Sequence, residues 1–142
     1  DGASALVLAR ESVAAEKGLT PVARIVAHST HSQHPSEFTA APCGAIETLL
    51  AKTGWNKDDV DLWEINEAFA MVTLLAIEDL GLDPARVNIH GGACAQGHPI
   101  GSTGSRIIVS LMYALKQHGG RRGVASLCIG GGEATAVAVE MA

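Results

Sequence analysis

The sequence predicts an α/β domain of three layers, in which helices cover both faces of a mixed, mostly parallel sheet of five strands. Short apolar segments, typical of buried strands, alternate along the chain with segments whose apolar residues recur at helical spacing. The last two apolar segments are separated by little more than three glycines, which is too short for a crossover, so that pair is antiparallel. A chain of 142 residues is long enough for one domain with its own core.

Five segments have the length and the aliphatic or β-branched content of buried strands: residues 3–9, 22–29, 60–65, 123–128 and 134–141. Residues 87–89 are a further candidate for a short strand. Because aromatic residues make up only 4% of the chain, the core between these strands and the helices must be aliphatic.

Four segments are predicted to be helical: residues 10–18, 42–54, 67–80 and 99–118. Glycine ends the first three, and a Gly-Gly pair follows the fourth, as expected for residues that close a helix in a left-handed conformation. Proline at 42 and 99 suits a first helical position. The last helix carries a clear apolar stripe, which consists of Ile107, Ile108, Leu111, Met112 and Leu115.

The composition argues against several classes of protein. Ten basic and fifteen acidic residues give a net charge of −5, so a broad nucleic-acid surface is not expected. No apolar run reaches the ~18 residues that span a membrane. Three cysteines without CxxC spacing fit a reduced, cytoplasmic compartment. The sequence begins abruptly and without methionine, so we expect it to be a piece of a longer protein or a processed product.

Glycine is the unusual feature of the composition. The chain has 16 glycines, and eleven of them lie between Gly91 and Gly132. Such clustering indicates a place where the backbone approaches a ligand closely. In α/β sheets that place is the carboxyl end of the strands, and Asn66, His98 and Cys128 are all expected there.

Each of these three residues has a functional and a structural interpretation. His98, just before a helix, is either a neutral imidazole that moves protons and stabilises an oxyanion, or a helix cap. Cys128 is either an acid/base thiol beside glycine N–H groups, or an inert core thiol. Asn66 either holds a water or a substrate carbonyl, or caps a helix, and the neighbouring Glu67 either acts as a base or favours the helix dipole.

Other polar side chains give weaker signals. Three histidines recur at every third position, but odd spacing puts two of them on opposite faces of a strand, so we expect no metal site at His28, His31 and His34. Cys94 is expected to be a packing residue, and Cys43, at a predicted helix start, a structural one.

Three motifs in order carry a resemblance: Asn66-Glu67-Ala68-Phe69-Ala70, then Gly91-Gly92-Ala93 leading into Gly97-His98-Pro99-Ile100-Gly101, then Cys128-Ile129-Gly130-Gly131-Gly132. They resemble the C-terminal domain of thiolases, the acetyl-CoA acetyltransferases and 3-ketoacyl-CoA thiolases, and the likeness extends from Asp1 to the last strand. It implies that residues 1–142 are one thiolase C-terminal domain. It also implies that the N-terminal half, which carries the nucleophilic cysteine, is absent.

The resemblance also implies a role for each motif. His98 activates the absent cysteine, and together with a water held by Asn66 it forms one oxyanion hole. Cys128 removes or returns the α-carbon proton. The N–H of Gly130 contributes to a second oxyanion hole. Cys94 and Gln96 stand where the family usually has aliphatic residues, so Gln96 is expected to alter the polarity around His98.

The implied activity is CoA-dependent cleavage of a 3-ketoacyl-CoA, or the reverse Claisen condensation of acetyl-CoA. Coenzyme A is then a substrate rather than a permanently bound cofactor, and the residues that bind it are not identified. The expected partners are an acyl-CoA, the N-terminal half and, at full length, further copies in a homodimer or homotetramer. The chain alone is expected to be inactive. Two alternatives stay open: a non-catalytic acyl-binding or interaction module, and a hydrolase that uses Cys128 and His98.

Overall fold

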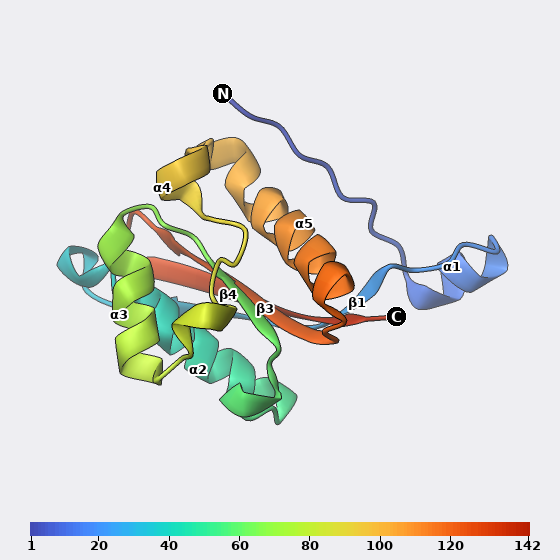
Figure 1. The fold of residues 1–142 in the computed structure, drawn as a ribbon, viewed down its shortest axis with the longest axis horizontal. Coiled ribbons are helices and arrows are strands. Elements are labelled where there is room, and N and C mark those ends of the chain that lie inside the picture. Colours follow the sequence, from blue (N-terminus) through green and yellow to red (C-terminus); the bar gives the residue numbers. More distant parts are fainter.

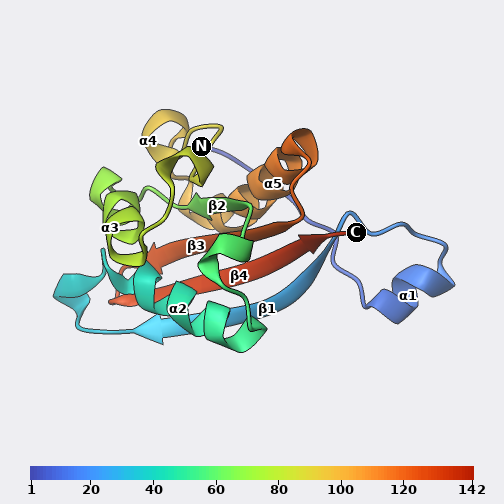
Figure 2. The ribbon, with the colours of Figure 1, turned by 60° about the horizontal axis from the view of Figure 1, so that its bottom comes forward.

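A four-stranded sheet between two layers of helices forms the body of the protein in the computed structural model, which describes residues 1–142. The strand order is β1-β4-β3-β2, with β1 (Ala23–Ser32), β2 (Leu62–Ile65), β3 (Arg122–Ile129) and β4 (Glu133–Met141). The helices α2 (Ala41–Thr53) and α3 (Ala70–Leu80) cover one face, and α5 (Ile100–His118) covers the other (Figure 2). The predicted three-layer architecture with a mixed sheet is therefore confirmed.

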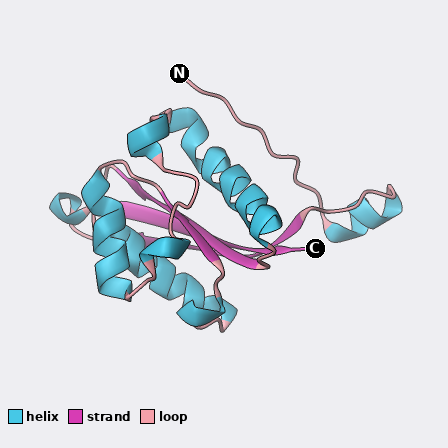
Figure 3. Cartoon of the chain, in the orientation of Figure 1, coloured by secondary structure: helices cyan, strands magenta, loops and turns pink.

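The remaining helices are short and lie outside these layers. Helix α1 (Glu11–Glu16) stands apart at one end of the molecule, and α4 (Ala93–Gln96) leads into α5 (Figure 1). Single-turn 3₁₀ helices occupy Pro35–Glu37, Lys57–Asp59 and Pro84–Arg86. Figure 3 shows the helices on both sides of the sheet and the extended segment at the N-terminus.

The prediction of five strands is wrong by one, because residues 3–9 form no strand. This segment runs past α5 (Figure 1), where the Ser4 hydroxyl lies 2.6 Å from the hydroxyls of both Ser102 and Ser105. A strand needs a neighbour with unpaired backbone groups, and a helix has already paired its own. The aliphatic side chains that suggested a buried strand are consequently exposed, Val7 to 96%.

The candidate strand at residues 87–89 is reduced to a single bridge between Val87 and Trp63. Asn88 ends it, because its backbone turns to a φ of +49°. The Asn88 side chain then takes over the role of a neighbouring strand: Oδ1 accepts from the Ile65 N–H and Nδ2 donates to the Ile65 carbonyl, both at 2.8 Å. A side-chain amide thus satisfies the edge of β2 where backbone pairing stops.

The prediction that the sheet is mostly parallel is also wrong. Strands β2 and β3 are parallel, but β4 pairs in antiparallel fashion with both β3 and β1. The chain returns directly from β3 into β4, and β4 then lies between β3 and β1 rather than at the edge of the sheet. One reversed strand in an interior position makes two of the three pairings antiparallel.

Side chains alternate along the strands and create two separate cores. The face towards α2 and α3 buries fifteen apolar residues, including Ile46, Leu49, Trp63 and Ile65. The face towards α5 buries seven: Leu62, Ile107, Leu111, Ala114, Leu115, Ala125 and Val139. Three residues of the predicted apolar stripe of α5, Ile107, Leu111 and Leu115, belong to this second core, and Ile108 packs against it. The same alternation puts Glu64, between Trp63 and Ile65, on the α5 face.

None of the helices combines the length and the apolar character that crossing a lipid bilayer would require.

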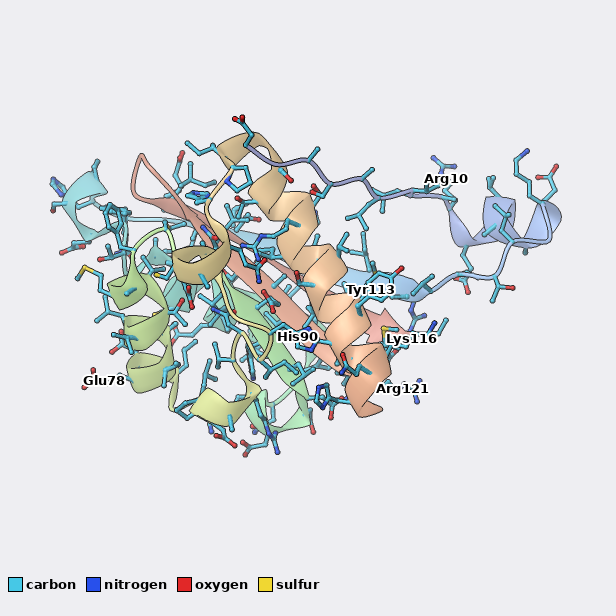
Figure 4. All side chains as sticks on the ribbon, turned by 45° about the horizontal axis from the view of Figure 1, so that its top comes forward. Arg10, Glu78, His90, Tyr113, Lys116 and Arg121 are labelled. Carbon is cyan, nitrogen blue, oxygen red and sulfur yellow. The ribbon has the colours of Figure 1, made fainter.

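Replacing Leu111 by alanine should destabilise the protein by about 2–5 kcal/mol, because the fully buried side chain leaves a cavity between α5 and the sheet. Denaturant unfolding followed by circular dichroism measures the change. Tyr113→Ala is the matched control, since Tyr113 lies on the same helix but is 66% exposed (Figure 4). Equal unfolding midpoints for the two variants would contradict this account of the core.

Candidate active site

Parallel pairing of β2 with β3 brings two of the three motifs together. The register runs from Leu62 opposite Gly123 to Ile65 opposite Ser126, and the Asn66 N–H then donates to the Ser126 carbonyl at 2.9 Å. Asn66 is thus anchored beside β3, two residues before Cys128. The β2–α3 loop, α4 and the β3–β4 turn gather at the same end of the molecule (Figure 1). The expectation that these segments share one edge of the sheet is confirmed for Asn66 and Cys128.

The His98 ring is fixed by the first turn of α5. Its Nδ1 lies 2.7 Å from the hydroxyl of Thr103, and that hydroxyl donates its proton to the Pro99 carbonyl at 3.0 Å. Because the hydroxyl proton is already used, Thr103 accepts from Nδ1–H, and of the two neutral tautomers this network favours the one in which Nε2 carries no proton. The His98 side chain forms no capping hydrogen bond with the backbone of α5, and its Nε2 has no hydrogen-bond partner within the protein.

Asn66 is not a helix cap, because α3 begins only at Ala70 with Phe69 in the capping position. The side chain of Asn66 is buried, at 2% exposure. Its Oδ1 accepts a hydrogen bond from Arg106 Nη2 at 3.3 Å, while Nδ2 has no partner within the protein. A buried amide without a partner is a site for a water or a substrate oxygen. The geometry therefore favours the functional interpretation of this residue.

Glu67 braces the loop that leads to His98. One carboxylate oxygen accepts from Asn88 Nδ2 at 3.1 Å, and the other accepts from the Cys94 N–H at 2.9 Å, at the start of α4. Gly92 is needed here because a Cβ atom would collide with the Glu67 carboxylate. The helix that Glu67 favours is therefore α4 and not the helix that follows it in the sequence. A carboxylate with both oxygens occupied is a support for the loop, not the base.

Cys128 is buried at the end of β3, where desolvation raises the pKa of its thiol. The thiol is consequently protonated at neutral pH, which suits a group that gives a proton to a carbanion. No hydrogen bond joins the thiol to His98, so the pair that the hydrolase hypothesis requires is not formed within this chain.

The β3–β4 turn exposes unpaired backbone donors next to Cys128. The N–H of Gly130 donates to no group in the protein, and the residue is exposed. The turn keeps this shape through Gly132, which has a φ of +92° and packs so closely on the backbone of Gln33 that a Cβ atom would collide with the Gln33 carbonyl. A free N–H beside a buried thiol is the arrangement expected of an oxyanion hole.

Two charged residues next to Asn66 were missed at the level of sequence, the buried Glu64 and the partly buried Arg106. Glu64, 2% exposed, lies with its Oε2 4.0 Å from Arg106 Nη1. Desolvation raises the pKa of Glu64 to about 7, Arg106 opposes this rise and the negative charge of Glu67 adds to it. The available signal was the position of an acid inside a fully buried strand, since such groups are retained only for a specific purpose.

The remaining polar side chains do not join the site. Cys94 is exposed, so the prediction that it packs in the core is wrong. Cys43 is buried against Asp79, and its pKa is raised to about 11 by desolvation and by that carboxylate, as fits a structural residue. Gln96 turns back on its own loop, where Nε2 donates to the Gly91 carbonyl at 3.1 Å.

The three histidines of the early motif have separate surroundings. His28 is exposed on β1, His31 packs over Gly44, and His34 caps a 3₁₀ turn. No group of three or more His, Cys, Asp or Glu side chains lies close enough to share a metal ion.

Together these features define an α/β domain with a buried amide, a buried thiol and unpaired N–H groups at the carboxyl ends of two parallel strands. The chain belongs to the thiolase family, since the family description "Thiolase, C-terminal domain" matches residues 19–141. It is 50% identical over 140 residues to the cytosolic acetyl-CoA acetyltransferase of Mus musculus, a match that covers 99% of this chain and 35% of that protein.

Two solved structures show the same fold. The acetyl-CoA acetyltransferase of Bacillus anthracis superimposes with a TM-score of 0.91 at 46% identity, over 93% of this chain and 34% of that one. A thiolase from Ascaris suum in complex with coenzyme A gives 0.90 at 43% identity, over 94% and 35% of the two chains. The chain thus spans about a third of the length of the relatives that it matches.

Iodoacetamide at neutral pH should modify Cys94 first. The pKa of all three thiols is raised, with desolvation as the first cause, so access decides the order, and only Cys94 is exposed. Mass spectrometry of the alkylated peptides measures the three rates, and Cys94→Ser should remove the fast phase. Faster labelling of Cys128 than of Cys94 would instead support a nucleophilic cysteine within this chain.

Glu64 should make the protein less stable as the pH rises. Its pKa is about 7 when folded against an ordinary value of 4.5, so between these values the folded state keeps a proton that the unfolded state has lost. Glu64→Gln should remove this decline, gaining up to about 3 kcal/mol over the parent between pH 4 and pH 8. Urea unfolding across that range tests it, with the exposed Glu78→Gln as control (Figure 4). A parallel pH dependence in parent and Glu64→Gln would contradict the assignment.

Proposed function

We propose that this chain is the acid/base domain of a thiolase that transfers an acyl group between coenzyme A thioesters. The longer protein would cleave a 3-ketoacyl-CoA with coenzyme A or, in reverse, condense two molecules of acetyl-CoA. The observation that carries the proposal is the set of groups at the strand ends: a free imidazole nitrogen, a protonated thiol and unpaired N–H donors. The names of the similar proteins, acetyl-CoA acetyltransferases, support it.

His98 is the base that activates the nucleophile, a cysteine that we place in the N-terminal half. Thr103 holds a proton on Nδ1, so in the neutral ring Nε2 is the nitrogen that accepts a proton. The imidazole takes the proton of the nucleophilic thiol, and the thiolate attacks the 3-keto carbon of the substrate. Covalent storage of the acyl group divides one difficult transfer into two easier ones.

Cys128 handles the proton on the α-carbon. When the bond between carbons 2 and 3 breaks, the electron pair passes into the enolate of acetyl-CoA, and the Cys128 thiol returns a proton to carbon 2. In the condensation the steps reverse and the thiolate of Cys128 removes that proton. The raised pKa supports this role, because a thiol closer in acidity to the carbon acid is the better base once it is deprotonated.

Two oxyanion holes follow from the free donors. The Gly130 N–H, with the N–H of the nucleophilic cysteine, would stabilise the oxygen of one tetrahedral intermediate. The imidazole of His98 and a water on Asn66 would stabilise the enolate oxygen, and the unpartnered Nδ2 of Asn66 supports this assignment.

Coenzyme A is the substrate, with no permanently bound cofactor, and residues 1–142 are one C-terminal domain in this proposal. Exposed apolar side chains on α3 and the preceding loop, Phe69, Met71 and Leu74, support further contacts with an N-terminal half or with other copies in a homodimer or homotetramer. Three free cysteines and a cytosolic relative support a cytoplasmic location.

A chimera tests the proposal. This chain should not cleave acetoacetyl-CoA by itself, but it should do so when it replaces the matching third of the cytosolic mouse relative. His98→Ala and Cys128→Ser should each lower kcat by about 10²-fold or more, as expected for loss of a general acid or base. Absorbance of the acetoacetyl-CoA enolate reports the cleavage.

Cys94→Ser is the matched control for Cys128→Ser, because the Cys94 side chain is exposed and the serine keeps the backbone N–H that binds Glu67. A folded but inactive chimera would favour a non-catalytic acyl-binding or interaction module. Turnover by the chain alone would overturn the assignment of the nucleophile to another part of the protein.

A further inference from the structure

Helix α5 carries two polar side chains on one face, and each contacts a different residue of the site. Thr103 holds the His98 ring, and Arg106, three residues later, donates from Nη2 to Asn66 Oδ1. Residues three apart lie on the same side of a helix. The next residue, Ile107, is fully packed in the core, so this face of α5 is fixed against the sheet. One rigid helix therefore sets the positions of both site residues.

Arginine selects one orientation of the Asn66 amide. A guanidinium has only hydrogen-bond donors, so it can pair with the Oδ1 atom of Asn66 but not with its N–H₂ group. Asn66 Nδ2 is thereby turned away from Arg106 and left without a partner. An asparagine without such a neighbour could present its oxygen or its nitrogen to the water that it holds. A water that accepts from Nδ2 keeps both of its protons for other acceptors, whereas a water that donates to Oδ1 keeps only one.

The unpaired polar atoms of the protein are concentrated at this point. Four buried side-chain nitrogen or oxygen atoms have no partner, and they are Glu64 Oε1, Asn66 Nδ2, Arg106 Nε and Arg106 Nη1. Unsatisfied buried groups are unfavourable for stability, and native proteins keep few of them. All four atoms belong to three side chains that contact one another, and one of the three is Asn66 of the site. Such a concentration is expected where buried polar groups serve a function.

The ion pair in this cluster is not built for stability. Glu64 Oε2 and Arg106 Nη1 are 4.0 Å apart, and no hydrogen bond joins them. A structural Arg–carboxylate pair is usually bidentate and shorter. The raised pKa of Glu64 agrees, since the attraction of Arg106 does not offset the desolvation of the carboxyl group. Glu64 limits the net charge around the guanidinium, while the close contact of Arg106 is with Asn66.

We propose that Arg106 is a positioning residue of the thiolase reaction, which holds the Asn66 amide with its N–H₂ group free to bind the water that, with His98, stabilises the oxyanion. This inference rests on the proposed function. It gives Arg106 no contact with substrate: the residue acts through Asn66, and it polarises the amide so that the N–H₂ group is a stronger donor.

Arg106→Met in the active chimera removes the donor while keeping the length of the side chain. We expect kcat to fall by roughly 10–100-fold, the effect of losing a hydrogen bond to a charged group, with KM changed by less than about threefold. Arg106→Lys keeps the positive charge but lacks the planar guanidinium, so its kcat should lie between those of Arg106→Met and the parent. Arg86→Met is the matched control, because Arg86 is exposed on a 3₁₀ turn outside the site.

The Asn66→Ala background separates positioning from a structural effect. If Arg106 acts through Asn66, Arg106→Met should change kcat by less than about twofold once Asn66 is alanine. If Arg106→Met lowers kcat as much in the Asn66→Ala background as in the parent, the inference is overturned. It is also overturned if Arg106→Met alone has the same kcat as the parent while His98→Ala is inactive. If Arg106→Met does not fold, Arg106→Lys decides, and kcat within about twofold of the parent would overturn the inference.

A measurement without activity keeps this inference distinct from the proposed function. In ¹⁵N-labelled protein the side-chain N–H₂ signals of Asn66 should shift in Arg106→Met and exchange faster with water, but stay unchanged in Arg86→Met. Unchanged Asn66 signals in Arg106→Met would overturn the inference even if the chimera were inactive. Shifted signals in an inactive chimera would leave the positioning intact and remove only the proposed function.

Discussion

The parallel pairing of β2 with β3 is the constraint on which the rest of the site depends. It anchors the Asn66 backbone to Ser126 and so places Asn66 beside the strand that ends in Cys128. The stretch of chain that crosses between these two strands contains α3, the glycine-rich loop, α4 and α5. Because a parallel pair needs such a crossover, the same requirement that builds the sheet also delivers His98 and its supporting helix to the strand ends.

Helix α5 and the sheet hold the side chains of the site, and the glycine-rich loops allow the backbone to pack closely around them. Helix α5 is packed on the sheet through Ile107, Leu111 and Leu115, and from this base it fixes His98 through Thr103 and Asn66 through Arg106. Glu67 binds the loop before His98 at two points. Such support limits the movement of His98 and Asn66, as the proposed function requires of groups that stabilise charge.

The residues of the candidate site are held in place within this chain, but several of their polar groups have no partner. The site's donors point to no partner within the chain, Phe69, Met71 and Leu74 are exposed, and residues 3–9 find no strand to join. The chain also spans about a third of the length of its relatives. The proposed function accounts for the unpaired donors, because it places the nucleophile in another part of the protein.

The sequence by itself determined the family, the three layers and the α5 stripe, and it proposed Asn66, His98 and Cys128 as site residues, because these depend on local periodicity and on motifs of short spacing. Only the tertiary structure decided the rest. Strand order is a long-range property, so the position of β4 between β1 and β3 and the absence of a strand at residues 3–9 were not predictable from local pattern. The choice between cap and functional residue likewise depended on partners distant in sequence, such as Arg106 for Asn66, 40 residues away, and a contact of that kind leaves no local signal.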